Sequence, residues 1–379
     1  MGSSVSKAAL GATTNEPVEP KAKHLADLIQ YINETNRSVE HLVDVLFKKT
    51  GSRSWVVVFK VLVTVHHLMV HGNERFIQHL ASRNSLFTLH NFLDKSVIEG
   101  YTMSTFIRRY SRYLNEKSLA YRMMASDITK TKRGLDGMMR TMNTTDLLNT
   151  LLVIQTQFDA LLNFNANPEE LTNGIVHAAF MLLFKDSLRL FAAYNEGILN
   201  LLGKYFDMKK SQCKDSLDIY IKFLGRTTKL AQFLKVAEQV GIDQNHIPYL
   251  TQTPHSLIEA LKQHLNSLEE KNEIFPPNRK LKEEGKEAMW KIIPGKGNDQ
   301  HKNPDECDER VDEITEGSPY WSFLHNQLLL RSPSKLVTHL RAANQHPQDG
   351  RQREGGEGAS TSCLPTNAQT RKGGAGLRV

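Results

Sequence analysis

Apolar side chains recur with the period of an α-helix almost without a break as far as about Glu270, and this pattern constrains the fold more than any other feature. Residues 25–32 and 42–47 each carry one such stripe. Residues 55–71 are apolar on nearly all sides, which is typical of a helix enclosed by its neighbours. Further stripes follow at 147–161, 171–206, 217–234 and 256–268. Strand signals are nearly absent, so we predict an all-α fold.

Consecutive helices joined by short connections stack into a solenoid, and the lack of a fixed sequence repeat predicts an irregular one. The helical pattern ends near Glu273, where Pro276, Pro277 and Pro294 and then glycines indicate a linker. The segment after Arg331 is rich in Gly, Arg, Ser and Gln and cannot bury enough apolar surface to fold alone. We expect three parts: an N-terminal segment (1–20), a helical domain (21–272) and a mostly disordered linker and tail (273–379).

The net charge of +7 suggests a nucleic-acid binder, but the distribution of the charge argues against one. Residues 331–379 contain eight basic and three acidic side chains, so this segment carries +5 and leaves only +2 for the rest. The run Phe106–Tyr113 interleaves aromatic residues with arginines, as some nucleic-acid surfaces do. The same spacing suits a helix that buries its aromatic side chains while the arginines pair with acids. We favour this second interpretation and expect no nucleic-acid partner.

No catalytic or metal motif stands out. The chain contains no phosphate-binding loop, dinucleotide fingerprint, zinc-protease helix or nucleophile elbow. His67 and His71 have helical i, i+4 spacing but no evident third ligand, so core or surface histidines are the better interpretation. The three widely spaced cysteines indicate free thiols in a reducing compartment. We expect a cytoplasmic or peripheral protein that is not an enzyme and has no cofactor and no metal site.

Three cationic or titratable side chains, Lys21, Lys23 and His24, lie where the first helical stripe begins. The amides of a first helical turn are unpaired and that end of the dipole is positive, so cations there are unfavourable. A phosphate bound to these amides would reverse the effect, with the lysines closing around it. Composition alone favours the alternative, a solvated linker that contains two lysines.

The first residues, Met1 to Lys7, match the pattern for N-myristoylation. Gly2 becomes the N-terminus after removal of methionine, and Ser6 stands at the required position. Short motifs of this kind also occur by chance, so modification of Gly2 is a hypothesis.

Several long blocks resemble the ANTH domain of the clathrin assembly proteins. They are Ser54–Lys60, His66–Phe76, Ser104–Tyr110, Asn165–Gly174, Phe180–Asp186, Ala192–Gly197 and Phe233–Ile242. The resemblance spans about Lys7 to Glu270. It implies a right-handed superhelix related to ENTH and VHS domains, in an adaptor for clathrin-mediated endocytosis. It also implies binding of phosphatidylinositol 4,5-bisphosphate without an enclosed pocket.

The lipid motif of this family is a lysine or glycine followed by Ala-Thr, a spacer, and then K-x-K-[HY]. Here it reads Gly11-Ala12-Thr13, a spacer to Pro20, and Lys21-Ala22-Lys23-His24. The resemblance therefore implies a headgroup site of Lys21, Lys23 and His24, with Gly11 at the first position. Gly11 and Ala22 stand where close relatives carry lysine. A basic residue at an anionic leaflet contributes about 1 kcal/mol, so this site alone predicts transient attachment. A myristoyl chain would add comparable binding.

The resemblance also implies protein partners. Later long helices of the family form a groove for a vesicle SNARE helix of the VAMP/synaptobrevin type. Leu202 falls at an apolar groove position and Thr227 where a relative has methionine, although the residues alone favour a core role. Family tails recruit clathrin and adaptor complexes through DPF and NPF motifs, which are absent from Glu273 to Val379. Two interpretations remain: a full adaptor at coated pits and coated vesicles of the plasma membrane, or a truncated regulatory form that binds lipid or SNARE without recruiting clathrin.

Overall fold

The computed structural model describes residues 4–34, 37–83, 86–134, 136–248, 250 and 255–270. All regular structure within these ranges is helical, and no strand occurs in them. The α-helices are α1 (Ser4–Ala12), α2 (Ala22–Asn33), α3 (Val39–Lys49), α4 (Trp55–His71), α5 (Glu74–Ser82), α6 (Glu99–Met124), α7 (Met138–Thr141), α8 (Thr144–Leu162), α9 (Gly174–Tyr205), α10 (Lys210–Gln239) and α11 (His255–Glu270). The all-α prediction is confirmed, whereas the predicted tail, 273–379, lies outside the described residues.

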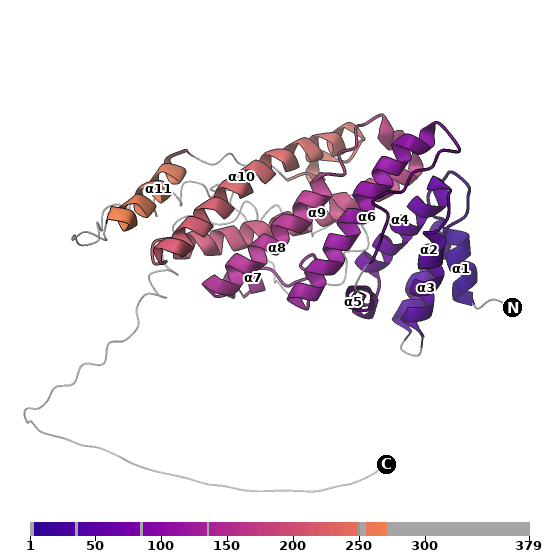
Figure 1. Ribbon diagram of the computed structural model, residues 1–379, viewed down its shortest axis with the longest axis horizontal. Helices are drawn as coiled ribbons and strands as arrows, with labels where there is room; N and C mark the ends of the chain where they lie inside the picture. The colour runs from indigo at the N-terminus through magenta and orange to yellow at the C-terminus, as the bar shows by residue number, and fades with distance from the viewer. Residues whose placement is uncertain are drawn as a thin grey trace, which may run out of the picture. The chain divides into compact units, whose positions relative to one another are not determined.

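Helices that follow one another in the chain mostly pack against one another (Figure 1). α1 to α3 cover one flank of α4, α6 and α8 lie side by side, and α8, α9 and α10 continue the stack towards α11. This succession is the irregular helical solenoid that the pattern of stripes predicted.

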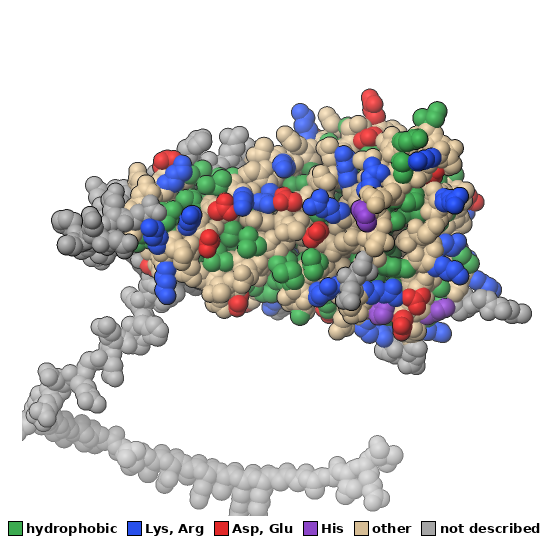
Figure 2. Space-filling model, in the orientation of Figure 1, with side chains coloured by type: hydrophobic (Ala, Val, Ile, Leu, Met, Phe, Trp, Pro, Cys, Tyr) green, Lys and Arg blue, Asp and Glu red, His purple; other side chains and the backbone are tan. Residues whose placement is uncertain are grey.

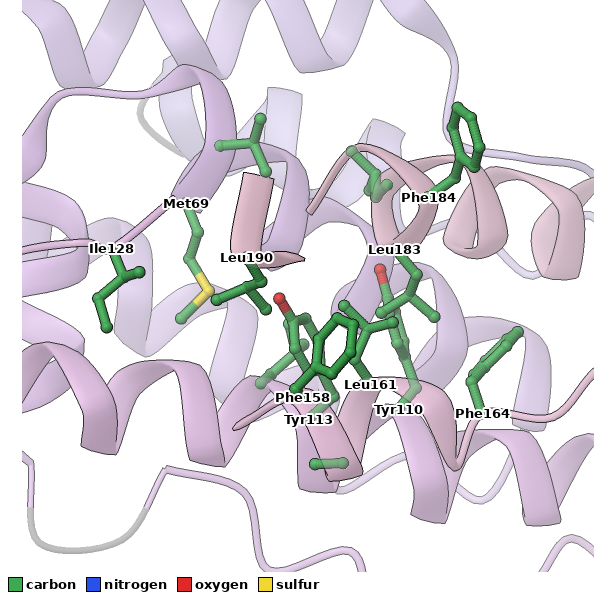
Figure 3. Close-up of a cluster of buried hydrophobic side chains, with 14 of the residues drawn as sticks. Met69, Tyr110, Tyr113, Ile128, Phe158, Leu161, Phe164, Leu183, Phe184 and Leu190 are labelled. Atoms are coloured by element: carbon green, nitrogen blue, oxygen red, sulfur yellow. The ribbon is translucent and has the colours of Figure 1, made fainter. Parts of the chain in front are cut away.

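α4 is enclosed by six other helices, which explains why residues 55–71 are apolar on almost every side. Phe59 and Val61, which lie on nearly opposite sides of α4, are both inaccessible to solvent. A second part of the core lies between α6, α8 and α9, where Tyr110, Phe158 and Leu183 converge (Figure 3). The long stripes of the sequence are therefore the buried faces of long helices.

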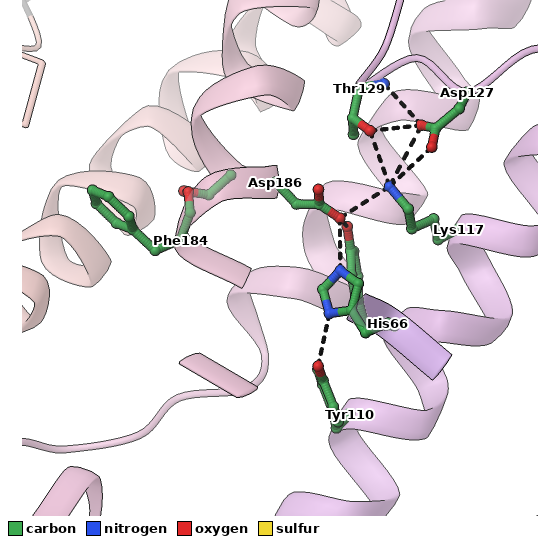
Figure 4. A network of polar contacts seen from close by, with 9 residues as sticks. His66, Tyr110, Lys117, Asp127, Thr129, Phe184 and Asp186 are labelled. Carbon is green, nitrogen blue, oxygen red and sulfur yellow. Dashed lines mark hydrogen bonds and ion pairs between the residues drawn. The ribbon is translucent and has the colours of Figure 1, made fainter. Parts of the chain in front are cut away.

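A network of buried polar side chains fastens α4, α6 and α9 together (Figure 4). His66 of α4 is hydrogen-bonded through Nδ1 to Tyr110 OH at 2.7 Å and through Nε2 to Asp186 Oδ2 at 2.9 Å. Tyr113 donates to the same carboxylate at 2.5 Å, and the Lys117 ammonium lies 3.0 Å from it. Asp186 of α9 is thus the centre of the network, and all its partners are buried.

The loop that follows α6 completes the network. Asp127 lies 3.3 Å from Lys117 and accepts hydrogen bonds from the amide and hydroxyl of Thr129. Burial alone would lower the pKa of Lys117, but Asp127 and Asp186 outweigh it and raise that pKa above its usual value. The ammonium is therefore held in its charged form by two carboxylates.

The aromatic and arginine-containing run in α6 is a buried face, as predicted. Phe106, Ile107, Tyr110 and Tyr113 are all buried. The expectation that the arginines pair with acids is wrong for two of them: Arg108 donates to the carbonyl of Phe92 at 2.8 Å, and Arg109 donates to that of Phe164 at 3.3 Å. Loop carbonyls that the neighbouring helices leave unpaired take the place of the expected carboxylates.

Candidate functional site

The predicted site lies at the end of the helix stack where four connecting segments gather, residues 13–21, 50–54, 93–98 and 163–173; we call it the loop end (Figure 1). Hydrogen bonds join these segments. Ser54 Oγ donates to Asn15 Oδ1 at 2.5 Å, and the Trp55 amide donates to Asp94 Oδ2 at 2.8 Å. Asn173 at the start of α9 donates to Glu99 at the start of α6 at 3.3 Å. The loop end is therefore one connected surface.

Lys21 and Lys23 both lie exposed at the start of α2. Lys21 occupies the N-cap position with an extended backbone, and its side chain makes no capping hydrogen bond. Its ammonium lies 3.5 Å from the Glu16 carboxylate, and 61% of the side chain is exposed. Such a pair is weak because water screens it, so an anion can compete for the ammonium. Two exposed lysines thus stand at a helix start that has no side-chain cap.

His24 is held against α1 by the absence of a side chain at Gly11. A Cβ atom added to Gly11 would lie 2.5 Å from His24 Nε2, so any other residue there would displace the imidazole. The ring is partly buried, and its Nδ1 atom lies 3.9 Å from the Asp27 carboxylate, too far for a hydrogen bond. Gly11 therefore lies beside His24, and it supplies space for the ring instead of a ligating group.

Lys60 is a cation beside the site that periodicity did not single out. It lies on α4 with 1% of its surface exposed, and its ammonium donates to Thr14 Oγ1 at 2.9 Å and to the Glu16 carbonyl at 3.2 Å. Burial lowers its pKa, although the neighbouring carboxylate of Glu16 opposes part of this shift. The one sequence signal for this role was a lysine inside an otherwise apolar helix. Lys60 anchors the loop that leads from α1 to Lys21.

Substitution Lys60→Met is expected to loosen this loop without unfolding the domain. Two hydrogen bonds from a charged donor are lost, but the cost of burying the ammonium is lost with them, so the free energy of unfolding changes by about 1 kcal/mol or less. Hydrogen exchange should accelerate at the amides of residues 14–21. Lys95→Met, an exposed lysine of the loop end, is the control. Unchanged exchange in Lys60→Met would contradict the anchoring role.

The predicted groove residues lie far along the stack from these lysines. Leu202 of α9 is 4% exposed, and Thr227 of α10 is half-buried and donates to the Phe223 carbonyl at 3.0 Å. Helix α11 packs nearby, where Tyr205 OH donates to the Leu261 carbonyl at 3.0 Å. Leu202 is thus a core residue in this structure, as the residues alone suggested.

The remaining features predicted or weighed from the sequence are Gly2, the histidine pair and membrane-spanning helices. Gly2 lies outside the described residues. The His67 and His71 rings are 4.5 Å apart, and the described part of the chain contains no group of three or more side chains suited to holding a metal ion. Among the described helices, none combines the length and apolar character needed to cross a bilayer.

Comparisons with known proteins agree with this fold. Residues 4–267 match the ANTH domain. The chain is 67% identical over 270 residues to the human phosphatidylinositol-binding clathrin assembly protein, a match covering 71% of this chain and 41% of that protein. It is 62% identical over 270 residues to the human clathrin coat assembly protein AP180, covering 71% of this chain and 30% of that protein.

A solved structure supports the fold alone. The cryo-EM structure of helical ANTH and ENTH tubules on PI(4,5)P2-containing membranes superposes with a TM-score of 0.54 and 17% sequence identity, over 70% of this chain and 100% of that one. The match to the two human proteins spans less than half of their length. ANTH-domain clathrin adaptors are non-enzymatic proteins, in agreement with the expectation for this sequence. The domain match covers well over half of the residues, and the chain belongs to the ANTH-domain family.

Proposed function

We propose that this chain is an endocytic adaptor that docks on membranes containing phosphatidylinositol 4,5-bisphosphate through Lys21, Lys23 and His24. The observation that carries the proposal is the pair of exposed lysines at the uncapped start of α2. The resemblance to phosphatidylinositol-binding clathrin assembly proteins supports the same ligand. Gly11 takes part by leaving room for the imidazole of His24.

The geometry suits a headgroup at a flat surface. Lys21 and Lys23 project from the rim of the loop end, where a bisphosphate can reach them without entering a cavity. First-turn amides and the helix dipole favour the same anion. Each basic residue contributes about 1 kcal/mol at an anionic leaflet, so attachment through these groups is reversible and weakened by salt.

Vesicle co-sedimentation tests the proposal. The full chain should sediment with phosphatidylcholine vesicles that contain phosphatidylinositol 4,5-bisphosphate and much less with vesicles given the same charge density by phosphatidylserine. Equal sedimentation with both would indicate general attraction to anionic surfaces and would remove the specific site.

We further propose that the α9–α10 surface receives a vesicle SNARE helix of the VAMP/synaptobrevin type. Thr227 lies on the same stripe of α10 as Phe223, Leu230 and Leu234, which supports an apolar helix contact along this stripe. Thr227→Lys should weaken binding of a SNARE peptide at least tenfold, because it sets a charge in an apolar contact. The neighbouring exposed Thr228→Lys is the control. Equal binding by Thr227→Lys would contradict the groove.

Recruitment of clathrin and adaptor complexes is a separate proposal, because it rests on residues 273–379. Pull-down of clathrin heavy chain by this segment would support the full adaptor at coated pits and coated vesicles of the plasma membrane. Failure to bind would favour the regulatory form that binds lipid or SNARE alone.

A further inference from the structure

Large apolar side chains protrude from the loop end, close to the basic site. Ile98 is 93% exposed, Tyr101 54%, Val97 47% and Leu93 41%. We call these four residues the apolar tip. Figure 2 shows apolar and basic side chains together at this end of the molecule. Isolated exposed apolar residues are common, but four from one short segment form a patch that indicates an interaction surface.

The backbone beneath the apolar tip is firmly held. Asp94, which is 3% exposed, accepts hydrogen bonds from the Trp55 amide at 2.8 Å and from the amide and hydroxyl of Ser96 at 2.8 and 2.6 Å. The Asp94 amide in turn donates to Ser104 Oγ at 2.9 Å. A Cβ atom on Gly100 would lie 2.6 Å from the Asp94 carbonyl, so the turn is closely packed. The tip is thus presented outwards by a fixed base.

The apolar tip and the headgroup site belong to one face. Trp55, which is bonded to Asp94, follows Ser54, which is bonded to Asn15 in the loop leading to Lys21. On the other side, Asn173 binds Glu99 at the start of α6. A leaflet contacted by Lys21 is therefore within reach of the tip.

We propose that the apolar tip inserts between the lipids of the leaflet whose headgroups Lys21 and Lys23 bind; this rests on the proposed function. Exposed cations, Lys95 in the tip segment and Arg53 in the adjoining loop, accompany it and suit an anionic surface. Tyrosine and aliphatic side chains beside basic residues are the composition of an interfacial anchor.

The loop end carries exposed acids as well as cations. Glu16 lies 3.5 Å from Lys21, Glu99 accepts a hydrogen bond from Asn173 at 3.3 Å, and Glu19 and Glu169 are also exposed. A site with only two lysines binds a membrane weakly. Insertion of apolar side chains into a bilayer would add binding that salt does not screen. Continuity with the headgroup site, and the exposed cations Lys95 and Arg53 next to the tip, favour a lipid surface over a protein partner.

The first test compares serine variants on vesicles containing phosphatidylinositol 4,5-bisphosphate. Val97→Ser with Ile98→Ser should lower vesicle affinity about tenfold, whereas Leu119→Ser with Met123→Ser should bind like the wild type. The control pair is also exposed, at 40% and 64%, and lies at the other end of α6. The two ends are separated by about 37 Å along the helix axis, at 1.5 Å per residue.

The second test detects insertion directly. An environment-sensitive fluorophore is attached to Ile98→Cys in the full chain carrying Cys307→Ser and Cys363→Ser; the remaining Cys213 is buried. Vesicle binding should shift the emission to the blue, and a label at Met123→Cys should show no shift.

The outcomes separate the inference from the proposed function. If the wild type shows no preference for phosphatidylinositol 4,5-bisphosphate, both the proposed headgroup site and the insertion are refuted. If it shows that preference but the Val97/Ile98 variant binds equally well, or the label at position 98 stays in water, the headgroup site stands and insertion is overturned. The tip would then face a protein.

Discussion

Substitution Asp186→Asn is expected to lower the free energy of unfolding by about 3–5 kcal/mol, because it removes one charge from a buried, hydrogen-bonded cluster and leaves its partners incompletely paired. Asp186 is fully buried and contacts Lys117 at 3.0 Å and His66 at 2.9 Å. Lys117 would retain only Asp127 as a counter-charge. Urea unfolding followed by circular dichroism measures the change.

A matched control separates this effect from the loss of any carboxylate. Asp218→Asn removes an acid whose partner, Lys222, lies 2.7 Å away on the surface of α10, with both side chains more than half exposed. Exposed helix pairs contribute about 0.3–0.5 kcal/mol, so this variant should stay close to the wild type. Equal stability losses in the two variants would show that the buried network contributes no more to the free energy of unfolding than an exposed ion pair does. In a double-mutant cycle, Lys117→Met should couple strongly to Asp186→Asn.

The network also determines whether the free energy of unfolding rises or falls with pH. Burial would raise the pKa of Asp186, but Lys117 and His66 outweigh burial and hold that pKa well below 3.8. Burial lowers the pKa of His66 below 6.5 despite Asp186. Both groups bind protons more weakly in the folded chain, so acid destabilises it: through His66 below about pH 6.5 and through Asp186 below about pH 4. In Asp186→Asn, the part of the stability loss below about pH 4 that comes from Asp186 should be absent.

Local periodicity predicted the helices well because burial of a continuous face determines both the sequence pattern and the element. The stripe at 55–71 became α4 with the same bounds, and the stripe at 147–161 lies within α8. Contacts between distant segments left no periodic signal. His66 and Asp186 are separated by 120 positions, and nothing local shows that their side chains meet.

The candidate site could likewise be predicted only where its residues are close together in the sequence. Lys21, Lys23 and His24 could be singled out because they are consecutive and break the rule for helix starts. Their environment could not be predicted, since it comes from other elements: α1, which no clear stripe marked, Lys60 of α4, and the Gly11 surface beneath His24. The apolar tip was hidden because an exposed Ile98 and a buried isoleucine look alike in a sequence.

Charge reversal at the start of α2, Lys21→Glu with Lys23→Glu, is expected to reduce affinity for vesicles containing phosphatidylinositol 4,5-bisphosphate by at least about thirtyfold. Each lysine contributes about 1 kcal/mol at an anionic leaflet, and each glutamate adds repulsion. Folding should be preserved, because both side chains are exposed and acids are favourable in a first helical turn. Co-sedimentation over a range of lipid concentrations measures the affinity.

A closely matched control exists at the far end of α9. Lys209 occupies the N-cap position of α10, as Lys21 does in α2, and is followed by the exposed Lys210. Lys209→Glu with Lys210→Glu changes the net charge equally, about 47 Å along α9 from the loop end at 1.5 Å per residue. If general attraction drove binding, both pairs would lose affinity alike; a local headgroup site requires that only the α2 pair does. Comparable losses would therefore refute Lys21 and Lys23 as the site, even if the protein still prefers the bisphosphate lipid.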